Sequence, residues 1–347
     1  MPPKIPRVSA SDEDLLKSNH GQEVGISHAE RAETVAFDRR AIPSDAFESR
    51  WLAPDGHALR RIDWSEPGEE ARGSLLFLPG RGDAYEKYLE ALDHWFRRGW
   101  RVTALDWRGQ AGSGRLGNDA VTGHVDDFAY WVADLSAFWR EWSAEQPGPH
   151  VLAGHSMGGH LALRAVAEAA VRPEALVLSA PMLGFLPGWL PDAVKHLAAR
   201  LMCRLGDPRR PAWRWSEKPG QLPEGRAALL THDADRYSDE LWWRLQRPEL
   251  VMGPGSWGWV RAGLASIAAL DRHGALEAVD LPVLLLSVSG DALVSAPAIG
   301  RAARRLPRSE HVIFGPEAHH EVLRETDPVR ERALAAIDDF LDRVLAP

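Results

Sequence analysis

The sequence predicts an α/β fold in which helices cover both faces of a mainly parallel β-sheet. Short apolar segments alternate with segments of helical period along most of the 347-residue chain. Alternation of this kind is typical of strand–helix–strand units, which place neighbouring strands in parallel. One long segment between two of the apolar stretches has no strand pattern, and this predicts an inserted group of helices.

The first predicted strands form a hairpin that follows a polar N-terminal arm. Residues 1–45 are polar, charged and aperiodic, which is typical of a loosely held arm. From Phe47 onward, the segment FESRWLAPDGHALRRIDW predicts two strands joined at the turn signal Asp55-Gly56.

Six further apolar segments predict the remaining strands of the sheet. In chain order they are GSLLFLPG (73–80), RVTALDW (101–107), HVLAGHS (150–156), EALVLSAP (174–181), LPVLLLSVSGD (281–291) and EHVIFGPEAHH (310–320). Helical periodicity between and after them predicts helices near 88–96, over 126–142, after residue 156 and over 327–345. The last of these begins with Asp327 and Pro328, as helices often do.

The segment 182–262 is predicted to be a helical cap, or lid, inserted into an α/β core that comprises 46–181 and 263–347. The segment is rich in tryptophan: Trp189, Trp213, Trp215, Trp242, Trp243, Trp257 and Trp259. Two interpretations are open. The indoles can serve the substrate, by lining an acyl-chain tunnel or forming a surface that touches lipid aggregates, or they can build the core of the cap itself. The stretch GFLPGWLP is the best candidate for an entrance lip, so Phe185 and Trp189 are candidate substrate-binding residues.

The net charge of −8 argues against a nucleic-acid partner and against binding to anionic lipid surfaces, both of which need clustered Lys and Arg. A local basic patch at Arg204, Arg209 and Arg210 is more typical of a solvated loop. Length and a hydrophobic fraction of 45% allow a large core without disulfides or metals.

The single cysteine, Cys203, excludes an intramolecular disulfide and lies in a helix-like stretch where a small packed thiol is expected. The N-terminal residues lack the apolar segment of a signal peptide. The sequence also has no run of about 18 apolar residues that could span a membrane. A cytoplasmic location is therefore expected.

The pattern Gly154-His-Ser-Met-Gly158 is typical of a nucleophile elbow, in which a serine occupies a strained turn between a strand and a helix. Glycines are needed two positions before and after Ser156 because strand and helix approach closely there. The N–H of Met157, at the start of the helix, is then a candidate donor to a substrate oxyanion. The alternative is an ordinary serine in a glycine-rich turn.

A serine nucleophile requires an acid and a histidine downstream, each placed just after a strand. Asp291 directly follows the most apolar predicted strand, although an aspartate there can also form a turn or a helix N-cap. The last predicted strand is followed by two histidines, His319 and His320. A metal site at these histidines is a weaker alternative, because no regularly spaced ligands accompany them. No metal or organic cofactor is expected.

The loop after the strand 73–80 is the candidate for a second oxyanion donor. Its sequence LPGRGD places the N–H of Arg81 at the required position, with Gly80 and Gly82 keeping the backbone approachable to substrate. A plain Gly/Pro turn is the alternative.

Together these motifs resemble the α/β-hydrolase superfamily, and within it the bacterial lysophospholipase and monoacylglycerol lipase group. The matching stretches are LPGRGDAYEKY, ALDWRGQAGSG, GHVDDFAYWVADL, LAGHSMGGHLAL, SVSGDALV and HHEVLRETDPVR. The resemblance extends from about Ala41 to the C-terminal region. In that group the catalytic histidine directly precedes a glutamate, which selects His320 over His319. The group's usual loop opens with His-Gly, whereas this chain has Pro79-Gly80.

The resemblance implies a serine hydrolase with Ser156 as nucleophile, His320 as base and Asp291 as the orienting acid. Its expected substrate is a carboxylic ester of a lipid, such as a lysophospholipid or a monoacylglycerol, with transient contact to lipid aggregates. A thioesterase or acyltransferase with the same triad is the nearest alternative. A non-catalytic binding protein of this fold is disfavoured, because it has no need of all three residues. Hydrolases with an aspartate nucleophile are disfavoured by the serine at 156.

Overall fold

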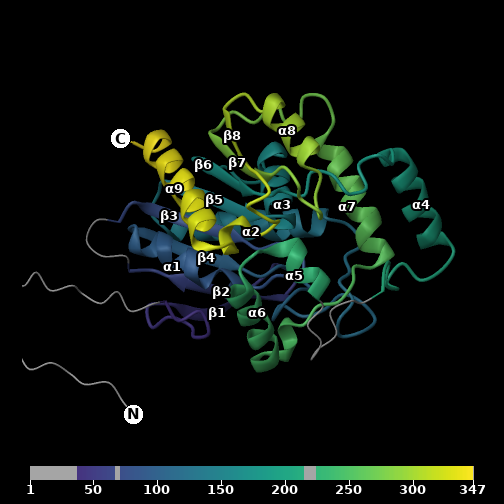
Figure 1. Ribbon diagram of the computed structural model, residues 1–347, viewed down its shortest axis with the longest axis horizontal. Coiled ribbons are helices and arrows are strands. Elements are labelled where there is room, and N and C mark those ends of the chain that lie inside the picture. Colours follow the sequence, from purple (N-terminus) through teal and green to yellow (C-terminus); the bar gives the residue numbers. More distant parts are fainter. Residues whose placement is uncertain (1–36, 67–70, 215–223, 347) are drawn as a thin grey trace, which may run out of the picture. The chain divides into compact units, whose positions relative to one another are not determined.

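Eight strands form one sheet within the part of the chain that the structure describes, with the order β1-β2-β4-β3-β5-β6-β7-β8 (Figure 1). The structure is a computed structural model that describes residues 37–66, 71–214 and 224–346. Residues from Asp38 onward form one compact unit. Most of the predicted arm, residues 1–45, lies outside the described residues.

The strands occur where the apolar segments predict them. Their bounds are β1 (Phe47–Leu52), β2 (Ala58–Trp64), β3 (Gly73–Leu78), β4 (Trp100–Leu105), β5 (His150–His155), β6 (Ala175–Ser179), β7 (Val283–Val288) and β8 (Ser309–Phe314). The hairpin β1–β2 is antiparallel and β2 is antiparallel to β4, while every other neighbouring pair is parallel. The prediction of a mainly parallel sheet is therefore confirmed.

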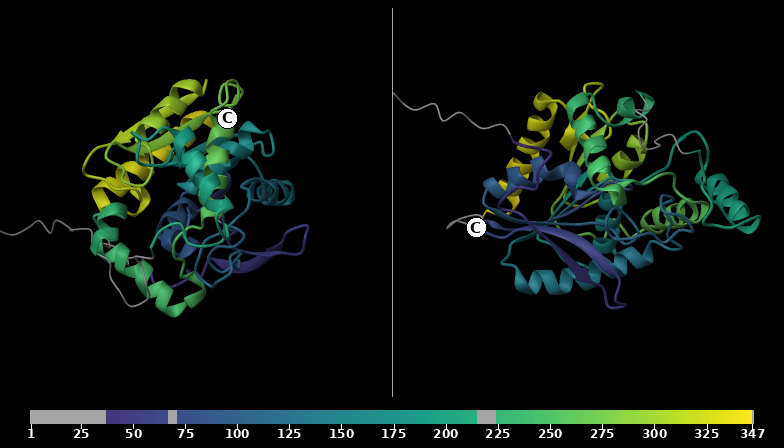
Figure 2. Two further views of the ribbon diagram at one scale, coloured as in Figure 1. Left: turned by 90° about the vertical axis from the view of Figure 1, so that its right-hand side faces the viewer. Right: turned by 90° about the horizontal axis from the view of Figure 1, so that it is seen from below.

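Helices cover both faces of this sheet. They are α1 (Leu89–Arg97), α2 (Ala129–Glu145), α3 (Met157–Ala167), α8 (Ala296–Arg305) and α9 (Asp327–Val344), with short 3-10 helices η1 (Tyr85–Tyr88) and η3 (Val322–Arg324). Figure 2 shows α2 on one face of the sheet and α1 and α9 on the other. Every residue of β3 and β7 is buried, which explains why these segments are continuously apolar rather than alternating. The predicted α/β class is confirmed.

The segment between β6 and β7 is helical in its described parts. It contains α4 (Asp192–Arg204), α5 (Glu224–Leu230), α6 (Ala234–Gln246), η2 (Pro248–Leu250) and α7 (Trp257–Leu270). Helix α4 packs against α7, and α7 contacts α3 of the sheet layer. The predicted cap boundary at residue 262 falls inside α7, and the division into core and cap stays a prediction.

Tryptophan builds much of the interior around the sheet. Six indoles outside the predicted cap are fully buried: Trp64, Trp95, Trp100, Trp107, Trp131 and Trp142. Several pack on other rings, such as Phe128 on Trp131 with centroids 4.8 Å apart. Large rigid side chains of this kind fill space and immobilise the strands whose C-terminal ends carry the candidate site.

Candidate functional site

Ser156 lies in a strained turn between β5 and α3, with φ 52° and ψ −115°. Positive φ is unusual for a residue with a side chain, and strain of this kind concentrates at functional sites. The flanking glycines are required by space. A Cβ on Gly158 would lie 2.2 Å from the carbonyl oxygen of Leu78, and one on Gly154 would lie 2.7 Å from the carbonyl carbon of Gly158. Only glycine at both positions lets α3 start this close to the sheet.

Asp291 and His320 form a buried pair at the ends of β7 and β8. The Nδ1 atom of His320 lies 2.7 Å from Oδ2 of Asp291, and the other carboxylate oxygen accepts the N–H groups of Leu293 and Val294 at 2.8 and 3.0 Å. The pKa of Asp291 is lowered from its usual value. Burial by itself raises this pKa, but the nearby His320 imidazole and the hydrogen bonds that the carboxylate accepts outweigh the effect of burial. An ionised carboxylate only accepts, so Nδ1 of His320 carries the proton and Nε2 is left as a base.

The neighbouring His319 faces a different environment. Its ring stacks on that of His232 with centroids 3.8 Å apart, and its backbone N–H donates to Glu325 at 2.7 Å. Burial and the adjacent His232 lower the pKa of His319. Of the two histidines that the sequence offers, the structure therefore pairs His320 with Asp291.

The loop after β3 places its backbone against the elbow. The N–H of Gly80 donates to Oδ2 of Asp83 at 3.1 Å, and a Cβ on Gly80 would lie 3.1 Å from Cβ of Ser156. Gly82 follows with φ +71°, a conformation that favours glycine. The backbone of Gly80 thus lies beside the serine, in the segment where the sequence predicts an oxyanion donor.

The Arg81 side chain is partly buried and packs against the helical segment. Its guanidinium lies over the rings of Trp213 and Trp259, 5.0 and 5.2 Å from their centroids, and donates to the carbonyl of Gly253 at 2.6 Å. Cation–π contacts of this kind fix the side chain. The contacts tie the loop after β3 to residues of the predicted cap.

A cavity of about 650 Å³ joins these groups, which lie at the C-terminal ends of the strands. Its lining includes Ser156, His320, Arg81, Phe185, Trp213 and Trp259. Phe185, a candidate substrate-binding residue, thus faces the same space as the candidate nucleophile. The other candidate of the entrance lip, Trp189, does not line this cavity and is 81% exposed.

The indoles of the predicted cap divide between the two interpretations. Trp257 lines the cavity together with Trp213 and Trp259. Trp243 is buried elsewhere, donates to the carbonyl of Arg39 at 2.9 Å, and packs edge-on against Trp242. Trp215 lies outside the described residues. Some of these side chains therefore border the candidate site, and others pack away from it.

Sequence reasoning missed a buried polar layer directly behind the site. The Nδ1 atom of His155, which precedes the serine, lies 3.1 Å from Asp83, and the hydroxyl of Tyr88 bonds to both. The ammonium of Lys87 contacts Asp83 at 2.6 Å and Glu321 at 2.5 Å. The signal available was the stretch DAYEKY (83–88) in the segment after β3, where an acid, Asp83, and a base, Lys87, stand four residues apart.

The described residues contain neither a metal-binding cluster nor a membrane-spanning helix. No group of three or more His, Cys, Asp or Glu side chains among them could hold a metal ion. None of the helices in the described ranges is both long and apolar enough to cross a bilayer. Cys203, the one cysteine, lies near the end of α4 and is partly buried.

Comparison with known proteins agrees with this architecture. Residues 69–327 match the family described as serine aminopeptidase, S33. Lysophospholipase L2 of Escherichia coli strain K12 is 30% identical over 286 residues, which cover 79% of this chain and 81% of that protein.

Two solved lipases are similar in structure. A soluble variant of monoglyceride lipase from Saccharomyces cerevisiae gives a TM-score of 0.68 at 20% identity, covering 88% of this chain and 96% of that one. Monoacylglycerol lipase of Paleococcus ferrophilus gives 0.62 at 21% identity, covering 82% and 99%. These likenesses confirm the predicted α/β-hydrolase fold. Because the family match covers most of the chain, the protein belongs to the serine aminopeptidase S33 family of α/β-hydrolases.

Proposed function

We propose that this protein is a serine hydrolase that cleaves carboxylic esters of lipids, such as lysophospholipids or monoacylglycerols. The observation that carries the proposal is the buried pair of Asp291 and His320, which opens onto the cavity that Ser156 lines. The family membership and the names of the relatives, a lysophospholipase and monoacylglycerol lipases, support the same reaction class.

In the proposed reaction, the Ser156 hydroxyl attacks the ester carbonyl carbon while Nε2 of His320 takes its proton. Asp291 orients the imidazole and stabilises the imidazolium that forms. The N–H groups of Met157 and Arg81 donate to the oxyanion of the tetrahedral intermediate. The carbon–oxygen bond to the alcohol then breaks, and His320 returns the proton to the leaving alcohol.

Water completes the cycle. His320 takes a proton from a water molecule, whose oxygen attacks the acyl carbon, and the bond to Oγ of Ser156 breaks as that oxygen regains a proton. The free acid leaves. All groups invoked belong to the chain, to the ester or to water.

The cavity lining supports an acyl chain as part of the substrate. Apolar side chains from the helical segment, including Leu186, Leu190 and Leu264, surround the space above Ser156. Burying an alkyl chain there gains about 0.8 kcal/mol per methylene group. This gain favours long-chain esters over acetyl esters of the same alcohol.

Helix α4 supports delivery of substrate from a lipid aggregate. Val194, Leu197, Leu201 and Leu205 follow one another at helical spacing, and each is about half exposed or more. Ala198 of the same helix lines the cavity. An exposed apolar ridge at the rim of an acyl-binding cavity fits transient contact with the surface of a micelle or membrane.

The decisive experiment combines active-site labelling with turnover. A fluorophosphonate probe is expected to label wild-type protein but not Ser156→Ala, and mass spectrometry of the labelled peptide should place the adduct on Ser156. A panel of p-nitrophenyl esters of increasing chain length, run beside lysophosphatidylcholine and monoacylglycerol, then gives the preferred substrate. A folded wild-type protein that neither reacts with the probe nor hydrolyses any ester would contradict the proposal.

A further inference from the structure

Lys87, whose side chain is only 4% exposed, stands at the centre of a network of ion pairs behind the candidate site. The ammonium of Lys87 lies 2.6 Å from Asp83, 2.5 Å from Glu321 and 3.0 Å from Glu240. Arg324 bonds to Glu240 and Glu321 as well. Buried charges are tolerated only when paired this closely, so these side chains hold one another in fixed positions.

Three contacts of Asp83 reach groups that flank the reaction centre. Its Oδ2 atom accepts the N–H of Gly80 at 3.1 Å, lies 2.9 Å from the Tyr88 hydroxyl and lies 3.1 Å from Nδ1 of His155. Burial raises the pKa of Asp83, but the Lys87 ammonium and the bond to His155 outweigh burial and lower this pKa well below its usual value. Asp83 is therefore an anion that accepts from several donors at once.

His155 extends these contacts from the elbow to the loop of the base. Its Nε2 atom lies 3.3 Å from the carbonyl oxygen of His320, and the two rings are 4.8 Å apart between centroids. Glu321, the next residue, is bound to Lys87. Asp83 and Lys87 thus connect three parts of the site: the loop after β3, the residue before Ser156 and the backbone of His320.

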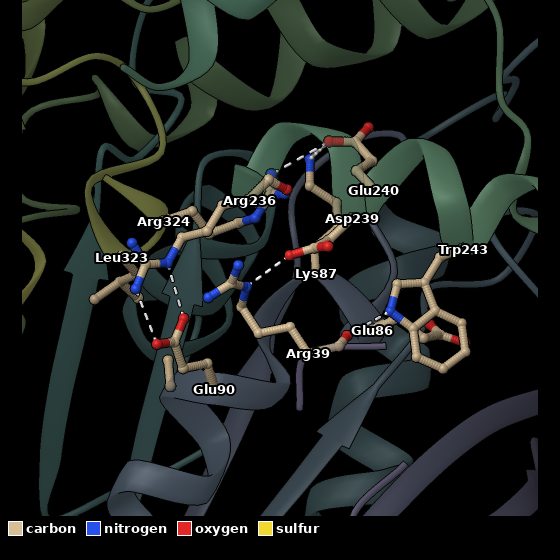
Figure 3. A pocket seen from close by; sticks show the side chains of 11 residues that line it. Arg39, Glu86, Lys87, Glu90, Arg236, Asp239, Glu240, Trp243, Leu323 and Arg324 are labelled. Carbon is tan, nitrogen blue, oxygen red and sulfur yellow. Dashed lines mark hydrogen bonds and ion pairs between the residues drawn. The ribbon is translucent and has the colours of Figure 1, made fainter. Parts of the chain in front are cut away.

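The inserted helices contribute to the same connection. Glu240 belongs to α6, and Figure 3 shows Lys87 and Arg324 both directed at its carboxylate. The backbone N–H of Glu321 also donates to the carbonyl of Leu230, at the end of α5, at 2.8 Å. The network therefore spans both the sheet layer and the helical segment.

We infer that Asp83, anchored by Lys87, is a positioning residue that fixes the Gly80–Arg81 backbone and the loop of His320 relative to Ser156. The inference rests on the proposed function. Asp83 itself does not react; it acts through the Gly80 N–H and through His155. Displacing the loop after β3 by a fraction of an ångström would misdirect the Arg81 N–H, and an oxyanion donor is effective only at hydrogen-bond distance.

The test is Asp83→Asn, which keeps the size of the side chain and removes the charge. The kcat for a soluble p-nitrophenyl ester is expected to fall about 10- to 100-fold, approaching the loss of one oxyanion donor. KM is expected to stay within about threefold, because the substitution removes none of the apolar side chains that line the cavity. Fluorophosphonate labelling of Ser156 should slow in parallel, since phosphonylation uses the same N–H groups.

The matched control is Asp338→Asn. Asp338 is also a buried carboxylate with close basic neighbours, lying 2.9 Å from Nε2 of His94 and 3.3 Å from Nε of Arg98, but it belongs to α9 and does not line the cavity. Its removal is expected to lower the thermal midpoint while kcat stays unchanged. A general loss of stability would therefore appear in both variants, and a loss of positioning only in Asp83→Asn.

Tyr88→Phe provides a milder second variant in case Asp83→Asn does not fold. It keeps the ring, which packs on Phe77, and removes only the hydroxyl between Asp83 and His155. A smaller loss of kcat with unchanged KM is expected. The inference is overturned if the folded variants label and turn over within twofold of wild type. Wild-type protein that labels at Ser156 but hydrolyses no lipid ester would instead overturn only the proposed substrate.

Discussion

Nδ1 of His320 lies 2.7 Å from one carboxylate oxygen of Asp291, while the other oxygen accepts two backbone N–H groups. The two carboxylate oxygens of Asp291 therefore have different hydrogen-bond partners and different roles. One shapes the turn after β7, and the other sets which nitrogen of His320 carries a proton. Aspartate after a strand was open to two interpretations, as a turn former or as a catalytic acid, and this side chain has the contacts of both.

Asp291→Asn is expected to lower kcat by about 10³- to 10⁴-fold. The amide oxygen must face the N–H groups of Leu293 and Val294, so the amide NH₂ faces Nδ1 of His320 and places the imidazole proton on Nε2. The base is then blocked while the fold is kept. Steady-state kinetics and circular dichroism check this, with the exposed Asp280→Asn as the control. A variant that keeps more than a tenth of wild-type kcat would contradict this assignment.

Substitution of the two adjacent histidines should have unequal effects. His320→Ala is expected to lower kcat by several orders of magnitude, on the scale known for loss of a triad base. His319→Ala removes a ring that stacks on His232 and should cost much less. Parallel measurement of kcat and of thermal midpoints distinguishes them. The opposite order would mean that His319 is the base.

Gly158→Ala is expected to destabilise the protein by about 1–3 kcal/mol or more, because overpacking forces the backbone apart. The new Cβ would lie 2.2 Å from the carbonyl oxygen of Leu78 and 2.5 Å from that of Pro79. Gly225→Ala in α5 is the control, since nothing lies within 4 Å of a Cβ there, and alanine favours helix. Urea unfolding measures both. Equal stabilities would show that α3 can move away from the sheet without cost.

Stability should decrease as the pH falls below about 6.5, the pKa of a free histidine. Burial and the neighbouring Arg164 lower the pKa of His160 to about 3 in the folded protein. Between these values the unfolded chain binds a proton that the folded chain does not, which lowers the free energy of unfolding by up to about 1.4 kcal/mol per pH unit.

The measurement is urea unfolding of wild-type protein, His160→Gln and the exposed His273→Gln at several pH values from 7 to 4.5. The His160 variant should show the shallower dependence on pH, and the His273 variant the wild-type slope. Identical slopes for all three proteins would show that His160 does not account for this part of the pH dependence.

The double substitution Leu197→Ser and Leu201→Ser is expected to raise the apparent KM for vesicle-presented monoacylglycerol about tenfold, because both side chains lose apolar area that would enter the lipid. The effect on a water-soluble short-chain ester should be smaller. Leu245→Ser, at an equally exposed leucine of α6, is the control. Equal losses on vesicles and on the soluble ester would argue against lipid contact through α4.

The order of strands and helices could be predicted because their signals are local. A continuously apolar segment such as 283–288 forms a strand buried on both faces, and glycines around Ser156 permit the close approach of α3. Asp291 and His320 were found as candidates for a similar reason. Each follows a strand, and the ends of parallel strands meet at one edge of a sheet.

The polar layer behind the site could not be predicted, because its members interact across long sequence separations. In sequence, Lys87, Glu240 and Glu321 are residue types that ordinarily lie on the surface. Only the packing of η1 against both α6 and η3 buries them together. The sequence also did not determine which indoles are exposed to solvent. Trp189 and Trp259 are the same residue type in the same predicted cap, yet the first is exposed and the second is buried.

The sequence by itself determined the α/β class, the elbow around Ser156, and the strand ends that carry Asp291 and the histidine pair. Periodicity, glycine spacing and residue type encode these features within a few residues. The family resemblance selected His320 over His319, and the structure pairs His320 with Asp291. The tertiary structure alone decided which indoles line the cavity, and that Lys87 lies among three carboxylates. These depend on side-chain directions and on burial, which arise only when distant segments pack against one another.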